Sequence, residues 1–136
     1  MPKEKHLFAK ISQSIILVRN ERVLLLRHLS GKWILPGGRL HVKEKWIDGL
    51  LREIKEETGI DHVENIRVLG VDNWKEKGEY HYGVFIYGTT KIDEVSLGSE
   101  HDDFIWATKE DVSRYKFWNK ELKDRVVHFV QSINLI

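Results

Sequence analysis

The chain has 136 residues, of which 41% are hydrophobic and 32% charged, and it contains no cysteine. We therefore expect one soluble globular domain over residues 1–136, and the absence of cysteine excludes disulfides and thiolate metal sites. The charges of 22 basic and 21 acidic residues nearly cancel, which leaves a net charge of +1 and gives no indication of membrane or specific nucleic-acid binding. Neither a membrane span nor a signal-peptide core is evident. We therefore expect a cytoplasmic protein.

The first part of the chain is predicted to form strands. Residues 9–19 combine a polar alternation with a continuous apolar run, which is typical of a strand. Asn20-Glu21 suits a two-residue hairpin turn into a second strand over residues 23–28. Residues 33–38 form a short apolar strand that ends in Pro-Gly-Gly. Such a turn lets backbone groups approach a ligand with no side chain in the way.

A helix is predicted over residues 45–58, and it has two different faces. Its apolar residues recur at i, i+3, i+4 and i+7 and form a stripe that can dock on a core. Glu53, Glu56 and Glu57 crowd another arc, where like charges repel. Gly49 projects into the acidic arc and costs about 1 kcal/mol relative to alanine. Such a cost is easier to understand if a bulky group must come close.

The same helix also has a plainer interpretation as a solvated amphipathic surface helix. Arg52 can pair with Glu56 four residues on, and Lys45 and Lys55 lie nearby in the sequence. The two interpretations differ in whether the acidic arc needs a metal ion. In either case Gly59 is available for a left-handed cap at the end of the helix.

The second half of the chain is again predicted to be rich in strands. We expect a strand centred on residues 66–71, a turn over residues 75–79, an alternating strand over residues 80–88, a polar loop over residues 89–99 and a short strand over residues 103–107.

A helix closes the predicted order of elements. Thr108 should cap a helical turn that runs through Val112, and Asn119 should cap the terminal helix. The apolar stripe of this helix consists of Leu122, Val126, Val127, Phe129, Val130 and Ile133. Such an order suits a mixed sheet with helices on both sides.

The residues around the acidic helix resemble a known signature. Gly38 is followed five residues later by Glu44 and, after seven more residues, by the segment REIKEETGI at residues 52–60. All nine defined positions of the Nudix box match over residues 38–60, so the chain resembles the Nudix hydrolases. The resemblance implies an α+β class with the Nudix fold, an α/β/α sandwich with a mixed sheet, and a single Nudix domain.

The chemistry of the box points to phosphoryl transfer with a hard metal ion. Carboxylates without thiols select Mg²⁺, or Mn²⁺, over softer metals. The resemblance implies an enzyme, a pyrophosphohydrolase, with Glu56 and Glu57 as principal metal ligands and the Gly38 carbonyl as a backbone ligand. It implies Glu53 as a further ligand or the catalytic base. Arg52, also in the catalytic set, would hold the carboxylates in register.

The general base and the substrate contacts stay open at this stage. Glu100, in a loop after the box, is the alternative base to Glu53, although it also suits a solvated acidic loop. Trp74, Tyr80 and Tyr82 could stack on a nucleotide base, although packing roles compete with this hypothesis.

The resemblance implies hydrolysis of a nucleoside diphosphate linked to another moiety. The chain is similar to small MutT-type members, and the candidate small-molecule substrates are nucleoside triphosphates, oxidised nucleotides and NDP-sugars. Two alternatives remain: a non-catalytic, nucleotide-binding regulatory Nudix domain and a plain interaction module whose helix is merely acidic. The chain could be a monomer or a homodimer.

Overall fold

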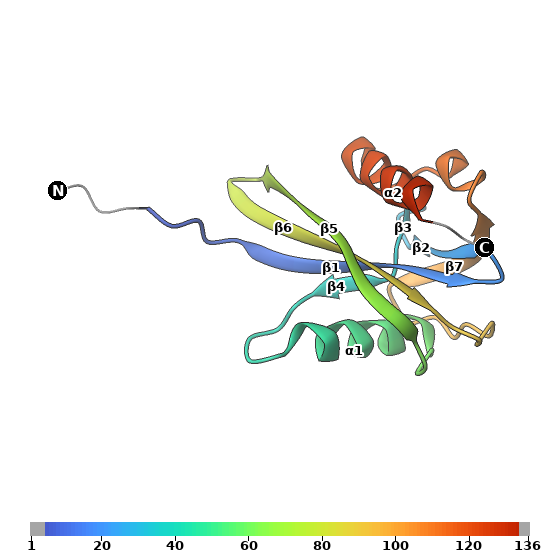
Figure 1. Ribbon diagram of the computed structural model, residues 1–136. Helices are drawn as coiled ribbons and strands as arrows, with labels where there is room; N and C mark the ends of the chain where they lie inside the picture. The colour runs from blue at the N-terminus through green and yellow to red at the C-terminus, as the bar shows by residue number, and fades with distance from the viewer. Residues whose placement is uncertain (1–4, 134–136) are drawn as a thin grey trace.

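The computed structural model describes residues 5–133, which form a seven-stranded mixed sheet between two α-helices (Figure 1). The predicted α/β/α sandwich is therefore confirmed. The strands are β1 (Lys10–Arg19), β2 (Arg22–His28), β3 (Trp33–Ile34), β4 (Gly37–Arg39), β5 (Glu64–Glu76), β6 (Glu79–Thr89) and β7 (His101–Thr108). The helices are α1 (Trp46–Thr58), the short 3₁₀ helix η1 (Val112–Arg114) and α2 (Lys120–Ser132).

Strand β1 organises the sheet. It pairs in parallel with β6 on one edge and antiparallel with both β2 and β4 on the other. The path through the sheet is β3-β2-β1-β6-β5, with β4 beside β1 and β7 beside β2. Asn20 and Glu21 join β1 to β2 with φ angles of 49° and 63°, which is the geometry of the predicted two-residue hairpin turn.

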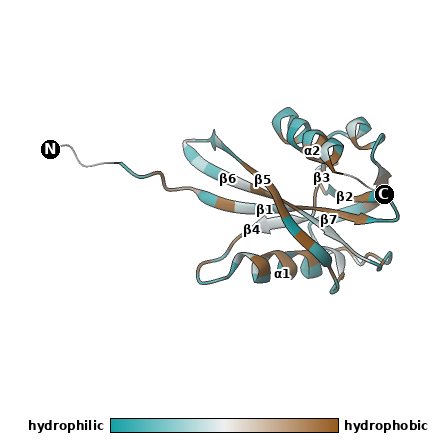
Figure 2. Ribbon diagram, viewed as in Figure 1, coloured by the Kyte–Doolittle hydropathy of each residue, from teal (hydrophilic) through white to brown (hydrophobic). Residues whose placement is uncertain are grey.

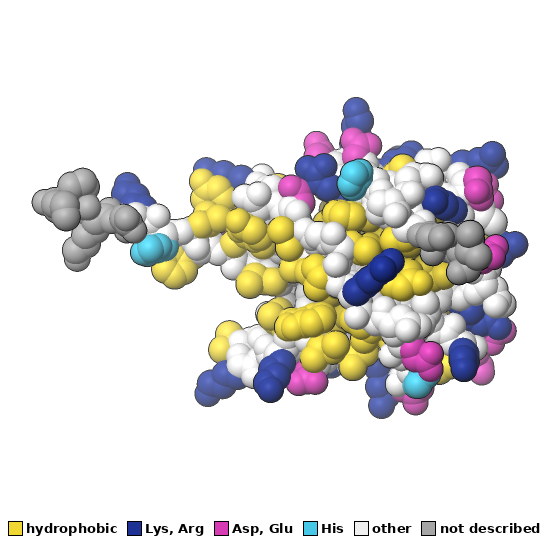
Figure 3. Space-filling view, viewed as in Figure 1, with side chains coloured by type: hydrophobic (Ala, Val, Ile, Leu, Met, Phe, Trp, Pro, Cys, Tyr) yellow, Lys and Arg dark blue, Asp and Glu magenta, His cyan; other side chains and the backbone are white. Residues whose placement is uncertain are grey.

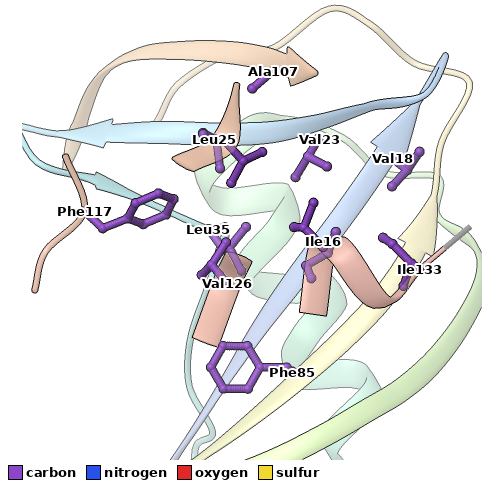
Figure 4. Close-up of a cluster of buried hydrophobic side chains, with 12 residues drawn as sticks. Ile16, Val18, Val23, Leu25, Leu35, Phe85, Ala107, Phe117, Val126 and Ile133 are labelled. Carbon is purple, nitrogen blue, oxygen red and sulfur yellow. The ribbon is translucent and has the colours of Figure 1, made fainter. Parts of the chain in front are cut away.

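The core consists of two apolar layers, one on each face of the sheet. In β1, Ile15 and Leu17 belong to the layer under α1, whereas Ile16 and Val18 belong to the layer under α2. This double burial explains the continuous apolar run in the sequence. Figure 2 shows the mixture of hydrophobic and hydrophilic residues along both α-helices. Figure 4 shows the second layer, in which side chains of the sheet meet those of α2.

One part of the sheet leaves apolar side chains exposed. The space-filling view shows them gathered along the extension that leads to the N-terminus and beside α1 (Figure 3). Ile11, Val71 and Tyr82 are exposed side chains of β1, β5 and β6. Among residues 5–133, no helix is long and apolar enough to cross a membrane.

Three local predictions were wrong in detail. Residues 33–38 are not one strand: β3 ends at Ile34, and β4 begins at Gly37 because its backbone pairs with β1 instead. The turn expected over residues 75–79 is confined to Lys77 and Gly78, since the hairpin strands pair up to that point. Thr108 does cap a turn, by accepting a hydrogen bond from the Asp111 N–H at 3.2 Å, but η1 begins at Val112 instead of ending there.

Replacing Leu50 with alanine should destabilise the fold because its fully buried side chain attaches α1 to the sheet. We expect a loss of about 2–5 kcal/mol in the free energy of unfolding, measured by urea denaturation. The matched control is Leu51→Ala, since the neighbouring Leu51 side chain is 37% exposed. Its loss should be about 1 kcal/mol or less. Equal losses in the two variants would contradict the observed docking face.

Candidate functional site

Helix α1 presents its acidic face toward strand β4. Leu50 and Ile54 are fully buried and fix the helix against the sheet, so the rotation of the helix about its axis is set. Gly59 ends the helix in a left-handed conformation with φ of 74°, and its N–H donates to the Lys55 carbonyl at 2.9 Å. The predicted cap is confirmed. The helix axis and its rotation together decide where its glutamates point.

Glu57 is the buried member of the acidic arc, with a relative exposure of 9%. Its Oε2 accepts a hydrogen bond from the Gly37 N–H at 3.3 Å. The pKa of Glu57 is raised to about 8, mainly by burial and in smaller part by the neighbouring Glu53 and Glu100, and the Gly37 N–H opposes this shift. Three of the predicted site carboxylates therefore act on one another in the folded chain.

The backbone of β4 lies directly against these carboxylates. A Cβ atom added to Gly38 would lie 2.6 Å from Cδ of Glu53. Gly37 has φ of 148°, and a Cβ atom there would lie 1.9 Å from the carbonyl oxygen of Gln13 in β1. Position 37 therefore requires glycine, whereas a side chain at position 38 would force the Glu53 carboxylate to move. The sequence analysis assigned no contact to Gly37, although the Pro-Gly-Gly turn indicated a close backbone approach.

Arg52 links the loop before α1 to the acidic arc. Its Nε and Nη2 donate to the two carboxylate oxygens of Glu44 at 2.6 and 3.0 Å, and its Nη1 donates to Glu53 at 2.9 Å. The Arg52 hydrogen bond, helped by the His41 N–H, lowers the pKa of Glu44 to about 2. The single guanidinium of Arg52 thus donates hydrogen bonds to several carboxylates, so its one positive charge neutralises the acidic arc only in part.

Glu56 is the exposed member of the arc. Its Oε2 accepts from Nη1 of Arg52 at 3.3 Å, which is the i, i+4 pair that the plainer interpretation of the helix expected. Its side chain is 58% exposed. Glu56 is therefore held toward Arg52, and its charge contributes less than the charges of Glu53 and Glu100 to the raised pKa of Glu57.

The bulky group that was expected close to Gly49 is a part of the chain itself. A Cβ atom at Gly49 would lie 2.6 Å from Oε1 of Glu44 and 2.8 Å from Cδ1 of Leu40. Because Gly49 has no side chain, the loop that carries Glu44, the partner of Arg52, can pack against the helix at this position. This contact supports Glu44 as a residue that holds the loop in place.

Glu100 approaches the site from the loop before β7. Its carbonyl accepts from the Leu29 N–H at 3.2 Å, which ties the loop before β7 to the end of β2. The next residue, His101, is 8% exposed, and burial lowers its pKa. Its ring lies edge-on to that of His28, with centroids 6.1 Å apart. The sequence offered no signal for this histidine contact, because the two residues are far apart along the chain.

The three aromatic residues considered for base stacking lie on the β5–β6 hairpin. Trp74 stacks on His81 with ring centroids 5.7 Å apart, and Lys75 lies over the Tyr80 ring at 5.3 Å. The register pairs Tyr82 with Asn73, so Tyr82 and Trp74 point to opposite faces of the sheet. These contacts do not bring the three side chains together, and their role in substrate binding stays a prediction.

The donor set suits a hard divalent cation in its chemistry. Within residues 5–133, no three acidic or histidine side chains are placed, as they stand, so that they could hold one metal ion. The nearby groups are nevertheless carboxylate oxygens and glycine backbone, which Mg²⁺ and Mn²⁺ prefer. The raised pKa of buried Glu57 indicates a site that lacks positive charge. The residues fit such an ion, provided that the carboxylates close around it.

Comparisons with known proteins agree with this arrangement. The family model for the NUDIX domain matches residues 10–128. The crystal structure of a MutT protein from Methanosarcina mazei superposes with a TM-score of 0.77 and 26% identity, over 95% of this chain and 98% of that one. The fold is therefore shared over nearly the whole of both chains.

Two curated proteins are similar in sequence. The NAD-capped RNA hydrolase NudC of Vibrio atlanticus is 44% identical over 64 residues, which are 44% of this chain but 23% of that protein. The nucleoside triphosphatase NudI of Klebsiella pneumoniae is 26% identical over 116 residues, covering 73% of this chain and 82% of that protein. The chain thus spans less than a quarter of the NudC sequence that it matches.

The Glu44–Arg52 pair should appear in the acid stability of the fold. Because folding lowers the pKa of Glu44 from 4.5 to about 2, its contribution is complete above pH 4.5 and is lost as the pH falls toward about 2. We expect the free energy of unfolding to fall less steeply over this range in Glu44→Gln than in the wild type, by urea titration. Glu110→Gln, an exposed remote change, should follow the wild type. Parallel curves for Glu44→Gln and the wild type would contradict the assignment.

Proposed function

Because the chain belongs to the Nudix family, we propose that it is a divalent-metal-dependent pyrophosphohydrolase. Its reaction would be the attack of water on the diphosphate of a nucleoside diphosphate that carries another group. Water would form a new P–O bond at one phosphorus atom while the bond from that phosphorus to the bridging oxygen breaks, and the proton released by the water would balance the charge on the leaving oxygen. The products would be a nucleotide and a phosphorylated remainder. A cysteine-free chain suits the reducing cytoplasm, and we propose a single catalytic domain over the whole chain.

The observation that supports this proposal is the buried carboxyl of Glu57 beside Glu53, Glu100 and the glycine backbone of β4. Burying one carboxylate among others is unfavourable unless a cation compensates for it. Bound Mg²⁺ would compensate for it, stabilise charge on the phosphate oxygens and make a bound water more acidic. The diphosphate would bring further negative charge, which the same ion can share.

The chain's own residues then take distinct roles. Glu56 and Glu57 would be the principal ligands and Glu53 a further one, with the Gly38 carbonyl as a backbone ligand. Glu56 must turn away from Arg52 to bind. Arg52 keeps its contacts with Glu44 and Glu53, and so orients the helix carboxylates against the loop.

Glu53 and Glu100 are the two candidates for the group that would accept the proton of the attacking water. Glu53 already accepts a hydrogen bond from the cationic side chain of Arg52 at 2.9 Å, so one of its carboxylate oxygens is already engaged. Glu100 is exposed, and no such cationic partner is recorded for it among the described residues. We therefore favour Glu100 as the general base and keep Glu53 as a metal ligand.

The substrate class is nucleotide-like, and nucleoside triphosphates are the first candidates. The nucleoside triphosphatase NudI aligns with 73% of this chain, whereas the NudC match covers 44% of it. Oxidised nucleotides and NDP-sugars remain substrates to be tested. Stacking on Trp74, Tyr80 or Tyr82 would require the substrate to reach the β5–β6 hairpin.

The activity should depend on Glu57. In a product-resolved screen of nucleoside triphosphates, oxidised nucleotides and NDP-sugars with Mg²⁺ and with Mn²⁺, we expect at least one to be cleaved between its phosphates. Glu57→Gln should lower kcat by about 10²–10³-fold through the loss of metal-borne charge stabilisation. The Glu110→Gln control should keep the wild-type rate. Cleavage of nothing in the screen, or full activity in Glu57→Gln, would contradict the proposal.

Mg²⁺ should also raise the melting temperature of the wild type, and the rise should grow with the logarithm of the Mg²⁺ concentration above the dissociation constant. A plain interaction module with an acidic helix would show no such shift. A regulatory Nudix domain would show the shift without turnover. The two measurements together therefore separate the three functions.

Glu100→Gln should lower kcat by about 10²-fold or more while the Mg²⁺ concentration at half-maximal thermal shift changes little. The reason is that a general base accepts a proton from the water and does not hold the metal ion. An unchanged kcat would return the role of base to Glu53.

A further inference from the structure

The loop over residues 91–99 is attached to the end of α1 through the backbone. The Ser96 N–H donates to the Thr58 carbonyl at 2.8 Å, and the Gly98 N–H donates to the Glu57 carbonyl at 3.2 Å. The last carbonyls of a helix have no partner within the helix. The loop therefore satisfies carbonyls at the end of the helix whose side chains form the site.

Gly98 makes this attachment possible by its lack of a side chain. A Cβ atom at Gly98 would lie 2.8 Å from the carbonyl oxygen of Glu56. That oxygen belongs to the helix backbone and cannot move aside without distorting α1. Gly98 has no positive φ angle, so alanine is compatible with its backbone conformation. The constraint at this position is the close approach to the helix.

Glu100 lies between this attachment and a second one. Its own carbonyl accepts from the Leu29 N–H at 3.2 Å, and the following His101 N–H is directed to the Gly98 carbonyl at 3.5 Å. The backbone of Glu100 is thus held two residues from the helix contact and at the end of β2. The helix contact is made to the carbonyl of Glu57, whose side chain lies within electrostatic range of Glu100.

We propose that Gly98 is a positioning residue, whose contact with the Glu56 and Glu57 backbone sets the place of Glu100 relative to the carboxylates of α1. This inference rests on the proposed function, because it assigns to Gly98 an effect on the water-activating group. Gly98 lies outside the Nudix box, and it touches no reacting atom.

Other contacts of the loop keep the fold independent of Gly98. Val95 and Leu97 pack against the apolar layer under α1, and the Trp106 indole N–H donates to the Asp93 carbonyl at 3.3 Å. An alanine at position 98 should therefore shift the loop near Glu100 without releasing it. Displacements of about 1 Å at a catalytic group can cost about 10²-fold in rate.

The test is Gly98→Ala, measured with the best substrate from the screen. We expect kcat to fall by about 10–100-fold, with KM and the Mg²⁺-dependent thermal shift close to those of the wild type. Glu94→Ala, an exposed change in the same loop, should have wild-type kinetics. A wild-type kcat in Gly98→Ala would overturn the proposal, as would a loss confined to KM.

A double-mutant cycle separates positioning from general loss of stability. In the Glu100→Gln background, Gly98→Ala should lower kcat by less than about twofold, because the group that it positions is already gone. Independent, multiplicative effects of the two changes would overturn the proposal. A wild-type kcat in Glu100→Gln would also overturn it while leaving the hydrolase function intact. If the wild type cleaves no compound in the screen, the proposed function fails together with this inference.

A second variant covers the case in which Gly98→Ala folds poorly. Ser99→Gly leaves the helix contact in place but loosens the chain between Gly98 and Glu100. Ser99 is exposed, so its replacement should hardly change the melting temperature. We expect kcat to fall several-fold in Ser99→Gly, because the Glu100 side chain is held less firmly. In the Glu100→Gln background the same change should have no effect on kcat. Wild-type kinetics in Ser99→Gly would overturn the proposed link.

Discussion

The buried carboxyl of Glu57 is the constraint on which the site depends. Its pKa is raised to about 8, mainly by burial, and its neighbours Glu53 and Glu100 contribute to this rise instead of opposing it. A fold that needed only an amphipathic surface helix would gain nothing from such a group. Under the proposed function, a divalent cation and the diphosphate of a substrate would make the arrangement favourable. The apolar docking of α1 through Leu50 and Ile54 keeps Glu57 in this position.

Glycine positions around Glu57 give the site its shape. Gly38 lies against Glu53, Gly49 admits the loop that carries Glu44, and Gly98 lies against the backbone of α1. In each case a methyl group would meet a carboxylate or a carbonyl oxygen at less than 3 Å. The three contacts bring strand β4, the loop before α1 and the loop before β7 to one helix. The charges are carried by the helix and by Glu100, while these glycines determine how closely the loops approach.

The sequence analysis correctly predicted the helix, its left-handed cap, the first hairpin and the Asn119 cap, whose Oδ1 accepts from the Leu122 N–H at 2.7 Å. Each of these features depends on residues close together in the chain. The split of residues 33–38 into β3 and β4 was missed because it results from pairing with two different partner strands. The contact of His28 with His101 was missed for the same reason. Periodicity carries no information about which distant strand a segment will meet.

The sequence by itself therefore determined the family and the fold class and predicted the carboxylates of the site, because spacing along a helix and the nine box positions are local properties. Only the tertiary structure decided that Glu57 is buried whereas Glu56 is exposed and paired with Arg52. It also decided that Glu44 takes the strongest contacts of Arg52, and that Glu100 lies within range of Glu57. The physical reason is that burial and electrostatic coupling depend on distances through space. In residues 38–60 these distances are set by a sheet and loops from other parts of the chain.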